Sequence, residues 1–281
     1  MTVVRTVKTG LVMGESPRWH DGRLWLSDWG AREIVAIGLD GASEVVVEAP
    51  PLPFCIDWLA DGRLLVVSGR EGLLLRKEDD GSLVTHADLM GIAAPPWNDI
   101  AVDGRGNAYV DYTGFDFPGG EFAPGGIALV TPDGAAQAVA AGLAFPNGIA
   151  VTPDNSTLIV AESYGSKLTA FDIADDGGLA NRRAWAELGD GVPDGICVDE
   201  EGAVWYGDVP NKRCVRVREG GEVLDTIELD RGCFACMLGG PVGRTLFMVT
   251  SEWRGSSRIA EEAGTGQVLV ADAPAAHAGW P

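Results

Sequence analysis

The sequence is poor in basic residues. Its 281 positions hold 21 Lys and Arg against 41 Asp and Glu, a net charge of −20 at neutral pH. A surface this acidic repels the phosphates of nucleic acids and the anionic headgroups of lipids. We therefore expect neither nucleic-acid binding nor electrostatic attachment to a membrane. Small molecules, cations and other proteins remain as partners, and the sequence leaves the oligomeric state open.

Long hydrophobic runs are missing too. No run of about eighteen apolar residues occurs, as a membrane span would need. The opening segment MTVVRTVKTG also lacks the apolar stretch of a signal peptide. These two absences predict a soluble, cytoplasmic protein.

Several signatures of catalysis and cofactor binding are absent. There is no Gly-x-Ser-x-Gly elbow, P-loop or Gly-x-Gly-x-x-Gly fingerprint. The three histidines, His20, His86 and His277, lie far apart, which argues against a Ser/His triad. The five cysteines are scattered and odd in number, so we expect free thiols. We interpret Cys233 and Cys236 as buried strand residues rather than as a redox or zinc site.

A repeated phrase is what the sequence does contain. A short apolar strand, a turn of the Asp-Gly type and a second apolar strand recur six times, with starts 40, 43, 49, 47 and 41 residues apart. Six units of about 45 residues are typical of the four-stranded blades of a propeller. A β-sandwich or a large barrel does not explain this period. We predict an all-β, six-bladed β-propeller formed by residues 1–281 as one domain, its last blade closed by segments from both termini.

One position of the phrase carries most of the chemistry. Aligned on their turns, the six copies begin at Glu15, Cys55, Asn98, Asn147, Asp194 and Ala235. Equivalent positions in blades converge on the axis, so two carboxylates and two amides would meet there and suit a divalent cation with open positions. This predicts a metal site at one end of the central channel, with Cys55 as a pocket wall. The alternative is that these side chains only cap turns.

Four stretches resemble one known family. They are GESPRW (14–19), WNDIAVDGRGNAYV (97–110), FPNGIAVTPDNSTLIVAES (145–163) and VPDGICVDEEGAVW (192–205). They are similar to the SMP-30/gluconolactonase family, which includes regucalcin and sugar-acid lactonases, with calcium-dependent phosphotriesterases as more distant relatives. The resemblance implies a six-bladed propeller with one catalytic divalent cation at the end of the central channel. From the oxygen ligands we expect calcium first, with Mg, Mn, Zn or Fe as alternatives.

The resemblance also implies roles for single residues. Glu15, Asn147 and Asp194 match the metal ligands of the family, and Asn98 matches an asparagine that contacts substrate or metal. Asp194 also matches the acidic residue assigned as acid/base. In members that act on sugar lactones, an Arg often stands where this chain has Pro96. The bidentate clamp that such an Arg offers to sugar hydroxyls or carboxylates is therefore missing.

Together with the cation site expected from the repeat, the resemblance implies a metal-dependent hydrolase that opens a lactone ring. The cation would polarise the carbonyl, and Asn98 would orient substrate or water. Either Asp194 takes the proton of the attacking water, or the cation itself activates that water. Asp99 is interpreted either as a partner that orients a ligand or as a turn cap. The alternatives are a calcium-dependent phosphotriesterase or esterase, and a non-catalytic propeller that binds a ligand around a structural cation.

A long loop is expected to add specificity. The segment DYTGFDFPGGEFAPGG (111–126) interrupts the third phrase, and Tyr112, Phe115 and Glu121 in it are predicted to contact substrate. Further apolar wall is expected from tryptophans, which suggests a lactone or ester less hydroxylated than a sugar lactone. These tryptophans are Trp58, Trp97 and Trp253.

Overall fold

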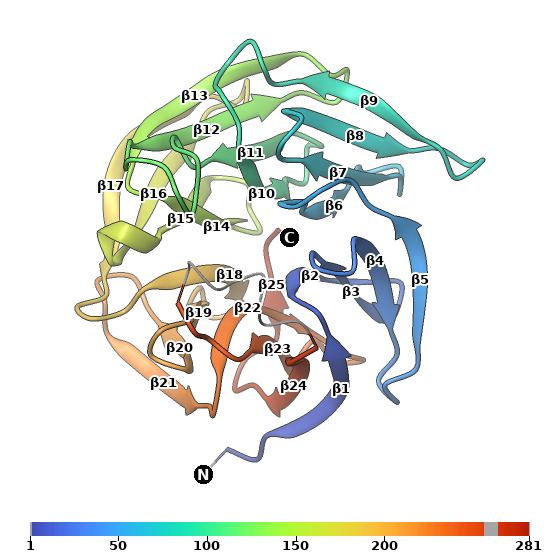
Figure 1. Cartoon of the computed structure of the whole chain (residues 1–281). Coiled ribbons are helices and arrows are strands. Elements are labelled where there is room, and N and C mark those ends of the chain that lie inside the picture. The colour runs from blue at the N-terminus through green and yellow to red at the C-terminus, as the bar shows by residue number, and fades with distance from the viewer. Residues whose placement is uncertain (1, 256–263, 281) are drawn as a thin grey trace.

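Six antiparallel sheets stand around a central axis in the computed structural model of the chain, which describes residues 2–255 and 264–280 (Figure 1). The prediction of a six-bladed β-propeller is confirmed. The predicted domain, 1–281, also includes residues 1, 256–263 and 281, which lie outside the described residues.

Each blade has one innermost strand, nearest the axis, and it is given first in the descriptions below (Figure 1). The first blade contains β2 (Gly14–His20), β3 (Arg23–Asp28), β4 (Glu33–Ile37) and β5 (Ser43–Glu48). The second contains β6 (Ile56–Trp58), β7 (Leu64–Ser68), β8 (Leu73–Lys77) and β9 (Leu83–Asp88). The third contains β10 (Trp97–Val102), β11 (Ala108–Tyr112), β12 (Gly125–Val130) and β13 (Ala136–Leu143).

The remaining three blades continue the ring. The fourth contains β14 (Pro146–Val151), β15 (Thr157–Glu162), β16 (Lys167–Ile173) and β17 (Leu179–Glu187), with the short 3-10 helix η1 (Ser163–Gly165) after β15. The fifth contains β18 (Pro193–Asp199), β19 (Val204–Asp208), β20 (Arg213–Val217) and β21 (Val223–Glu228). The sixth contains β22 (Gly232–Gly239), β23 (Thr245–Ser251), β24 (Gly266–Asp272) and, as its outer strand, β1 (Arg5–Leu11).

The turns and the packing follow from the repeated phrase. Asp21 and Gly22 (φ 48° and 72°) and Asn155 (φ 58°) adopt the positive φ that tight hairpins need, as their types predict. Strands such as β7 and β10 are buried at every residue, because neighbouring blades cover both of their faces. The core therefore lies between blades and leaves the axial ends of the ring free to form a site.

Both ends of the chain fasten the ring. The N-terminal strand β1 pairs with β24, so the last blade is closed by both termini, as predicted. The C-terminal strand β25 (His277–Ala278) pairs with the far end of β18 at Val198, and Trp280 bridges to Val151 at the far end of β14. Residues 277–280 thus pair with the ends of β18 and β14, away from the start of these strands.

Two further sequence expectations can be compared with the structure. All five cysteines are buried and free, which confirms the expectation of free thiols. Among the described residues, no helix has the length and apolar character needed to cross a membrane.

Candidate active site

The four predicted ligand residues lie at one place. Glu15, Asn98, Asn147 and Asp194 stand near the start of β2, β10, β14 and β18, and all four line one cavity of about 640 Å³ at that end of the axis. The other two equivalent positions, Cys55 and Ala235, line a much smaller cavity that shares Glu15, Asn98 and Asn147 with the first. The repeat position therefore converges on the axis in all six blades.

A local irregularity positions each of these side chains. The pairing register of the innermost strand shifts at each of these residues: between Glu15 and Arg18 in β2, Trp97 and Ile100 in β10, Pro146 and Ile149 in β14, and Pro193 and Ile196 in β18. A bulge of this kind bends the strand and redirects a side chain, here from the face of the blade toward the axis. Next to Glu15, Ser16 takes a left-handed backbone (φ 50°), and its Oγ accepts a 3.0 Å hydrogen bond from the N–H of Ile56 in the next blade.

The two amide side chains are held by hydrogen bonds. Asn98 donates its Nδ2 to Oδ1 of Asn147 at 3.3 Å, and Asn147 donates its Nδ2 to Oγ of Ser163 at 3.4 Å. Ser163 donates in turn to the carbonyl of Pro193 at 2.7 Å, next to Asp194. With both amide nitrogens engaged, oxygen is the atom that Asn98 offers to a ligand in the cavity.

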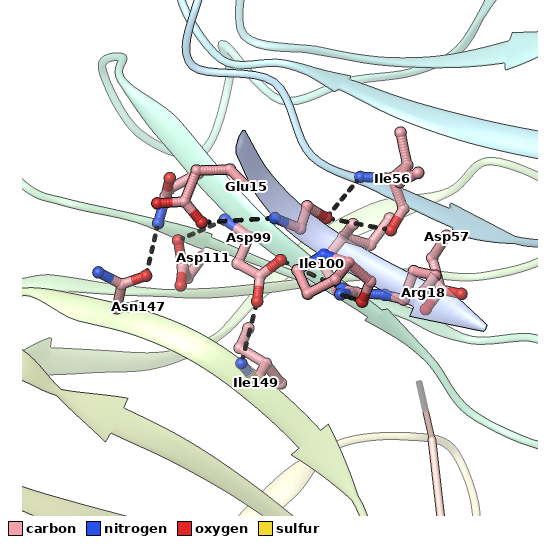
Figure 2. Close-up of polar contacts among 12 residues, drawn as sticks. Glu15, Arg18, Ile56, Asp57, Asp99, Ile100, Asp111, Asn147 and Ile149 are labelled. Atoms are coloured by element: carbon pink, nitrogen blue, oxygen red, sulfur yellow. Dashed lines mark hydrogen bonds and ion pairs between the residues drawn. The ribbon is translucent and has the colours of Figure 1, made fainter. Parts of the chain in front are cut away.

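The carboxylates form an acidic cluster. Burial raises the pKa of Glu15 well above its usual value, and the charge of Asp194 raises it further. Burial also raises the pKa of Asp194, with the charge of Asp99 adding to the effect. A nearby positive charge, Arg18, is engaged elsewhere: its Nη2 donates to Asp99 at 3.2 Å and to the carbonyl of Ile100 at 2.5 Å (Figure 2). Arg18 lowers the pKa of Glu15, but by less than burial and the charge of Asp194 raise it.

Asp99 links three blades rather than capping a turn. It accepts from Arg18 of β2 at Oδ1 and from the N–H of Ile149 of β14 at Oδ2, 3.2 Å away (Figure 2). Asp57 makes the same kind of link one blade earlier, since its Oδ2 accepts from the N–H of Val102 at 2.7 Å. Asp57 was not singled out in the sequence, because it does not share the place of Asp99 in the phrase: it stands two residues after Cys55, whereas Asp99 directly follows Asn98.

Acidic residues at the end of second strands support the segments that lead into the site. Asp28 accepts from the N–H groups of Val12 and Met13, just before Glu15. Glu162 accepts from the N–H of Ala144 and Asp208 from that of Val192, ahead of Asn147 and Asp194. The sequence analysis missed these three acids. The recurrence of an acid at the end of LWLSD, LIVAE and WYGD is the signal that would have found them.

The wall of the cavity is largely apolar. Trp253, predicted as wall, lines it, and so does Pro96 in the place of the family's Arg. Apolar residues that the sequence analysis did not single out also line it: Val12, Met13, Trp29, Leu52, Phe117, Phe145, Tyr164, Val209 and Phe234.

Other predicted wall and substrate residues lie elsewhere. Tyr112 is not among the lining residues, because its ring packs on the fully buried Trp97 at 5.1 Å. Trp58 is stacked on His20 at 4.1 Å, away from the cavity. Glu121 is exposed on its loop and does not line the cavity, and Phe115 packs behind Phe117. A direct contact of Tyr112 or Glu121 with substrate therefore has no support in this geometry.

The predicted ligand set fits a hard divalent cation. Its donors are two carboxylates and two amides, all oxygen, and the mutual repulsion of Glu15 and Asp194 is what a bound cation would relieve. Within residues 2–255 and 264–280, no cluster of three or more His, Cys, Asp or Glu side chains forms a metal site. A site here would thus depend on Asn98 and Asn147 as well as on the two acids.

Comparisons with known proteins agree on one family. A sequence profile of the SMP-30/gluconolactonase/LRE-like region matches residues 13–252. The chain is 25% identical to a pentonolactonase of Haloferax volcanii (81% of this chain, 84% of the relative). It is 26% identical to a 6-deoxy-6-sulfogluconolactonase of Pseudomonas putida (93% and 90%). A solved gluconolactonase from Xanthomonas campestris superposes with a TM-score of 0.77 at 25% identity, over 96% of this chain and 89% of that one.

Proposed function

Since this chain belongs to the SMP-30/gluconolactonase/LRE-like family, we propose that it is a hydrolase that opens a lactone ring with the help of one divalent cation, calcium first. The observation that carries the proposal is the convergence of Glu15, Asn98, Asn147 and Asp194 on one cavity. Relatives named as lactonases support the reaction class.

Glu15, Asn147 and Asp194 would hold the cation, and Asn98 would reach either the cation or the substrate. When bound, the cation supplies an electrostatic partner for the negative charge that develops on the lactone carbonyl oxygen. Asn98 adds an amide for orienting the substrate or the attacking water. Its position is fixed by its hydrogen bond to Asn147.

Proton transfer is assigned to Asp194. In the proposed reaction its carboxylate takes a proton from the attacking water and returns it to the alkoxide that leaves when the ring opens. The apolar wall of the cavity excludes other water and so strengthens these electrostatic interactions. Because Pro96 stands where an Arg clamp would be, we propose a substrate with fewer hydroxyls than a sugar lactone.

The test is hydrolysis of a panel of lactones, carboxylic esters and organophosphate triesters, before and after removal of divalent cations with EDTA. We expect lactone hydrolysis that is lost on chelation and restored by calcium. Asp194→Asn should lower kcat by about 10²- to 10⁴-fold. Asp190→Asn is the control, because Asp190 is exposed and pairs with Arg213 away from the cavity.

Three outcomes would contradict the proposal. Turnover of triesters but not lactones would favour the phosphotriesterase, and calcium binding without any turnover would favour a ligand-binding propeller. Lactone hydrolysis that survives both chelation and Asp194→Asn would remove the roles of the cation and of Asp194.

A further inference from the structure

One wall of the cavity is aromatic and comes from two neighbouring blades. We call it the aromatic wall; its members are Phe115, Phe117, Phe122, Phe145 and Tyr164. Their ring centroids lie 4.7 to 6.2 Å apart in a continuous series of contacts. Phe117, Phe145 and Tyr164 line the cavity, whereas Phe115 and Phe122 support them from behind. Aromatic surfaces of this kind bind apolar groups, which are driven out of water.

Further apolar side chains line the same cavity. Phe234 and Trp253 pack edge to face at 5.9 Å, and Met13 and Val209 pack with them. All four line the cavity. A substrate is therefore enclosed by hydrocarbon on more than one side, apart from the polar residues at the axis.

Few charged groups are available to hold a polar substituent. Among the described lining residues, the charged ones are Glu15, Asp194 and Arg70. Arg70 is already engaged: it pairs with Asp116 and donates to the carbonyl of Phe117 at 3.3 Å. A sugar hydroxyl buried against Phe117 or Phe145 would lose its hydrogen bonds to water without replacement by these rings, at a cost of roughly tenfold or more in affinity.

Phe145 lines the cavity with a strained backbone. It has a left-handed backbone (φ 59°), which is uncommon for a bulky residue and costs conformational energy. Hydrogen bonds hold that conformation: its N–H donates to the carbonyl of Leu143 at 3.1 Å, and its carbonyl accepts from Ser163 at 3.0 Å. Strain of this kind is typical of functional sites, and here it belongs to a residue that lines the cavity directly before the strand carrying Asn147.

We propose that the substrates are lactones that carry an apolar alkyl or aryl substituent, with the ring at the four polar residues and the substituent against Phe117, Phe145 and Tyr164. This inference rests on the proposed hydrolase function and adds its substrate class. The opening of the cavity is apolar too, because Leu52 and Tyr164 line the cavity and are 42% and 54% exposed. A substituent longer than the cavity would thus still meet apolar surface.

The test is a homologous series of γ-lactones with substituents from methyl to octyl, compared with gluconolactone. We expect KM to fall by about fourfold per added methylene until the cavity is filled, with kcat little changed. Gluconolactone should be the poorer substrate by kcat/KM. A flat response to chain length, or a preference for gluconolactone, would overturn the proposal.

Two variants assign the effect to the wall. Phe145→Asn removes the ring while keeping a residue that tolerates a left-handed backbone. It should raise KM for the octyl lactone by roughly tenfold or more, and by much less for the methyl lactone, which has little substituent to bury against the ring. Phe122→Ala is the matched control, since Phe122 belongs to the same wall but is 50% exposed and does not line the cavity. Equal effects of the two variants would contradict the assignment.

A binding measurement separates this inference from the proposed function. Lactams with the same substituents serve as probes, because an amide bond resists hydrolysis far more than an ester bond. Their binding is measured by tryptophan fluorescence, since Trp29 and Trp253 line the cavity. If lactam affinity rises with chain length but no lactone is hydrolysed, the apolar binding site is supported and the proposed hydrolase function is contradicted. If lactones are hydrolysed but lactam affinity does not rise with chain length, the hydrolase function is supported and the apolar substrate class is contradicted.

Discussion

Asp57 and Asp99 show how a single buried acid can join neighbouring blades. Each stands in an innermost strand and accepts a backbone N–H from the innermost strand of the next blade. A carboxylate with such partners replaces hydrogen bonds that strands on separate sheets cannot make with one another. These two residues therefore hold β6, β10 and β14 in register around the site without touching the cavity as ligands.

Asp57 makes stability depend on pH. Burial raises its pKa to about 6, against the opposing effect of Arg18 and of the N–H groups of Val102 and Trp58. The folded protein thus binds this proton more tightly than the unfolded chain. The free energy of unfolding from this group should fall as pH rises from about 4 to about 6, by roughly 3 kcal/mol.

The measurement is urea unfolding across that pH range for the wild type and for Asp57→Asn. The free energy of unfolding of the variant should change less between pH 4 and 6 than that of the wild type, because an amide does not titrate there. The variant is also expected to lose stability at every pH, because the single oxygen of Asn cannot replace both carboxylate oxygens that accept from Val102 and Trp58. The slope of the unfolding free energy against pH is therefore the quantity to compare, and not its absolute value. Parallel profiles for the two proteins would show that Asp57 does not titrate in this window.

At the scale of the element, the site depends on how closely the innermost strands approach. Gly148 of β14 follows Asn147, and a Cβ built on it would lie 2.6 Å from the carbonyl oxygen of Asp194 and from the N of Ile196. At Gly195 of β18 a Cβ would lie 2.4 Å from that of Ala235. Glycine next to the site residue thus lets β14, β18 and β22 come close enough for their side chains to share one cavity.

We predict that Gly148→Ala separates β14 from β18 and moves Asn147 away from Asp194. Overpacking of this kind costs about 1 to 3 kcal/mol of stability. Calcium affinity, measured by calorimetric titration, should fall by more than the change in stability alone suggests, because two of the proposed ligands move apart. Gly91→Ala is the control, since a Cβ at Gly91 meets nothing within 4 Å. Unchanged calcium affinity in Gly148→Ala would contradict this account.

At the scale of the whole molecule, closure of the ring is the decisive contact. β24 is the last strand of the sixth blade along the chain, and β1 covers its edge. An uncovered edge presents unpaired N–H and C=O groups to other chains. The pairing also joins the two ends of the sequence, so that the blades between them are held in a ring.

We therefore predict that a chain starting at Gly10 self-associates and unfolds at a lower temperature than the full protein. A chain starting at Val4, which keeps all of β1, is the matched control. Size-exclusion chromatography with light scattering and thermal unfolding give the two readouts. If both truncated chains behave alike, β1 contributes little to closure.

Sequence by itself determined the architecture and the polar centre of the site. A phrase that repeats every 45 residues or so specifies a strand, a hairpin turn and a second strand through local patterns alone, and copies of one unit have few ways to pack. The same repeat register brought Glu15, Asn98, Asn147 and Asp194 to one cavity. Their roles as ligands and catalysts stay a prediction for the experiments above.

Only the tertiary structure decided which side chains form the walls of the cavity. Tyr112 ends β11 and Glu121 lies in the long loop that follows, and neither lines the cavity, whereas Phe117 from that loop does. Phe145 and Arg70 reach the cavity from other blades. Phe145 stands two residues before Asn147, a place where the residue type varies among the copies of the phrase, so the repeat does not predict an aromatic ring there. Periodicity reports the backbone of a blade, but the direction of a loop side chain is set by neighbours distant along the chain. For this reason the ring and its polar centre follow from the sequence, while the apolar surface that would select the substrate does not.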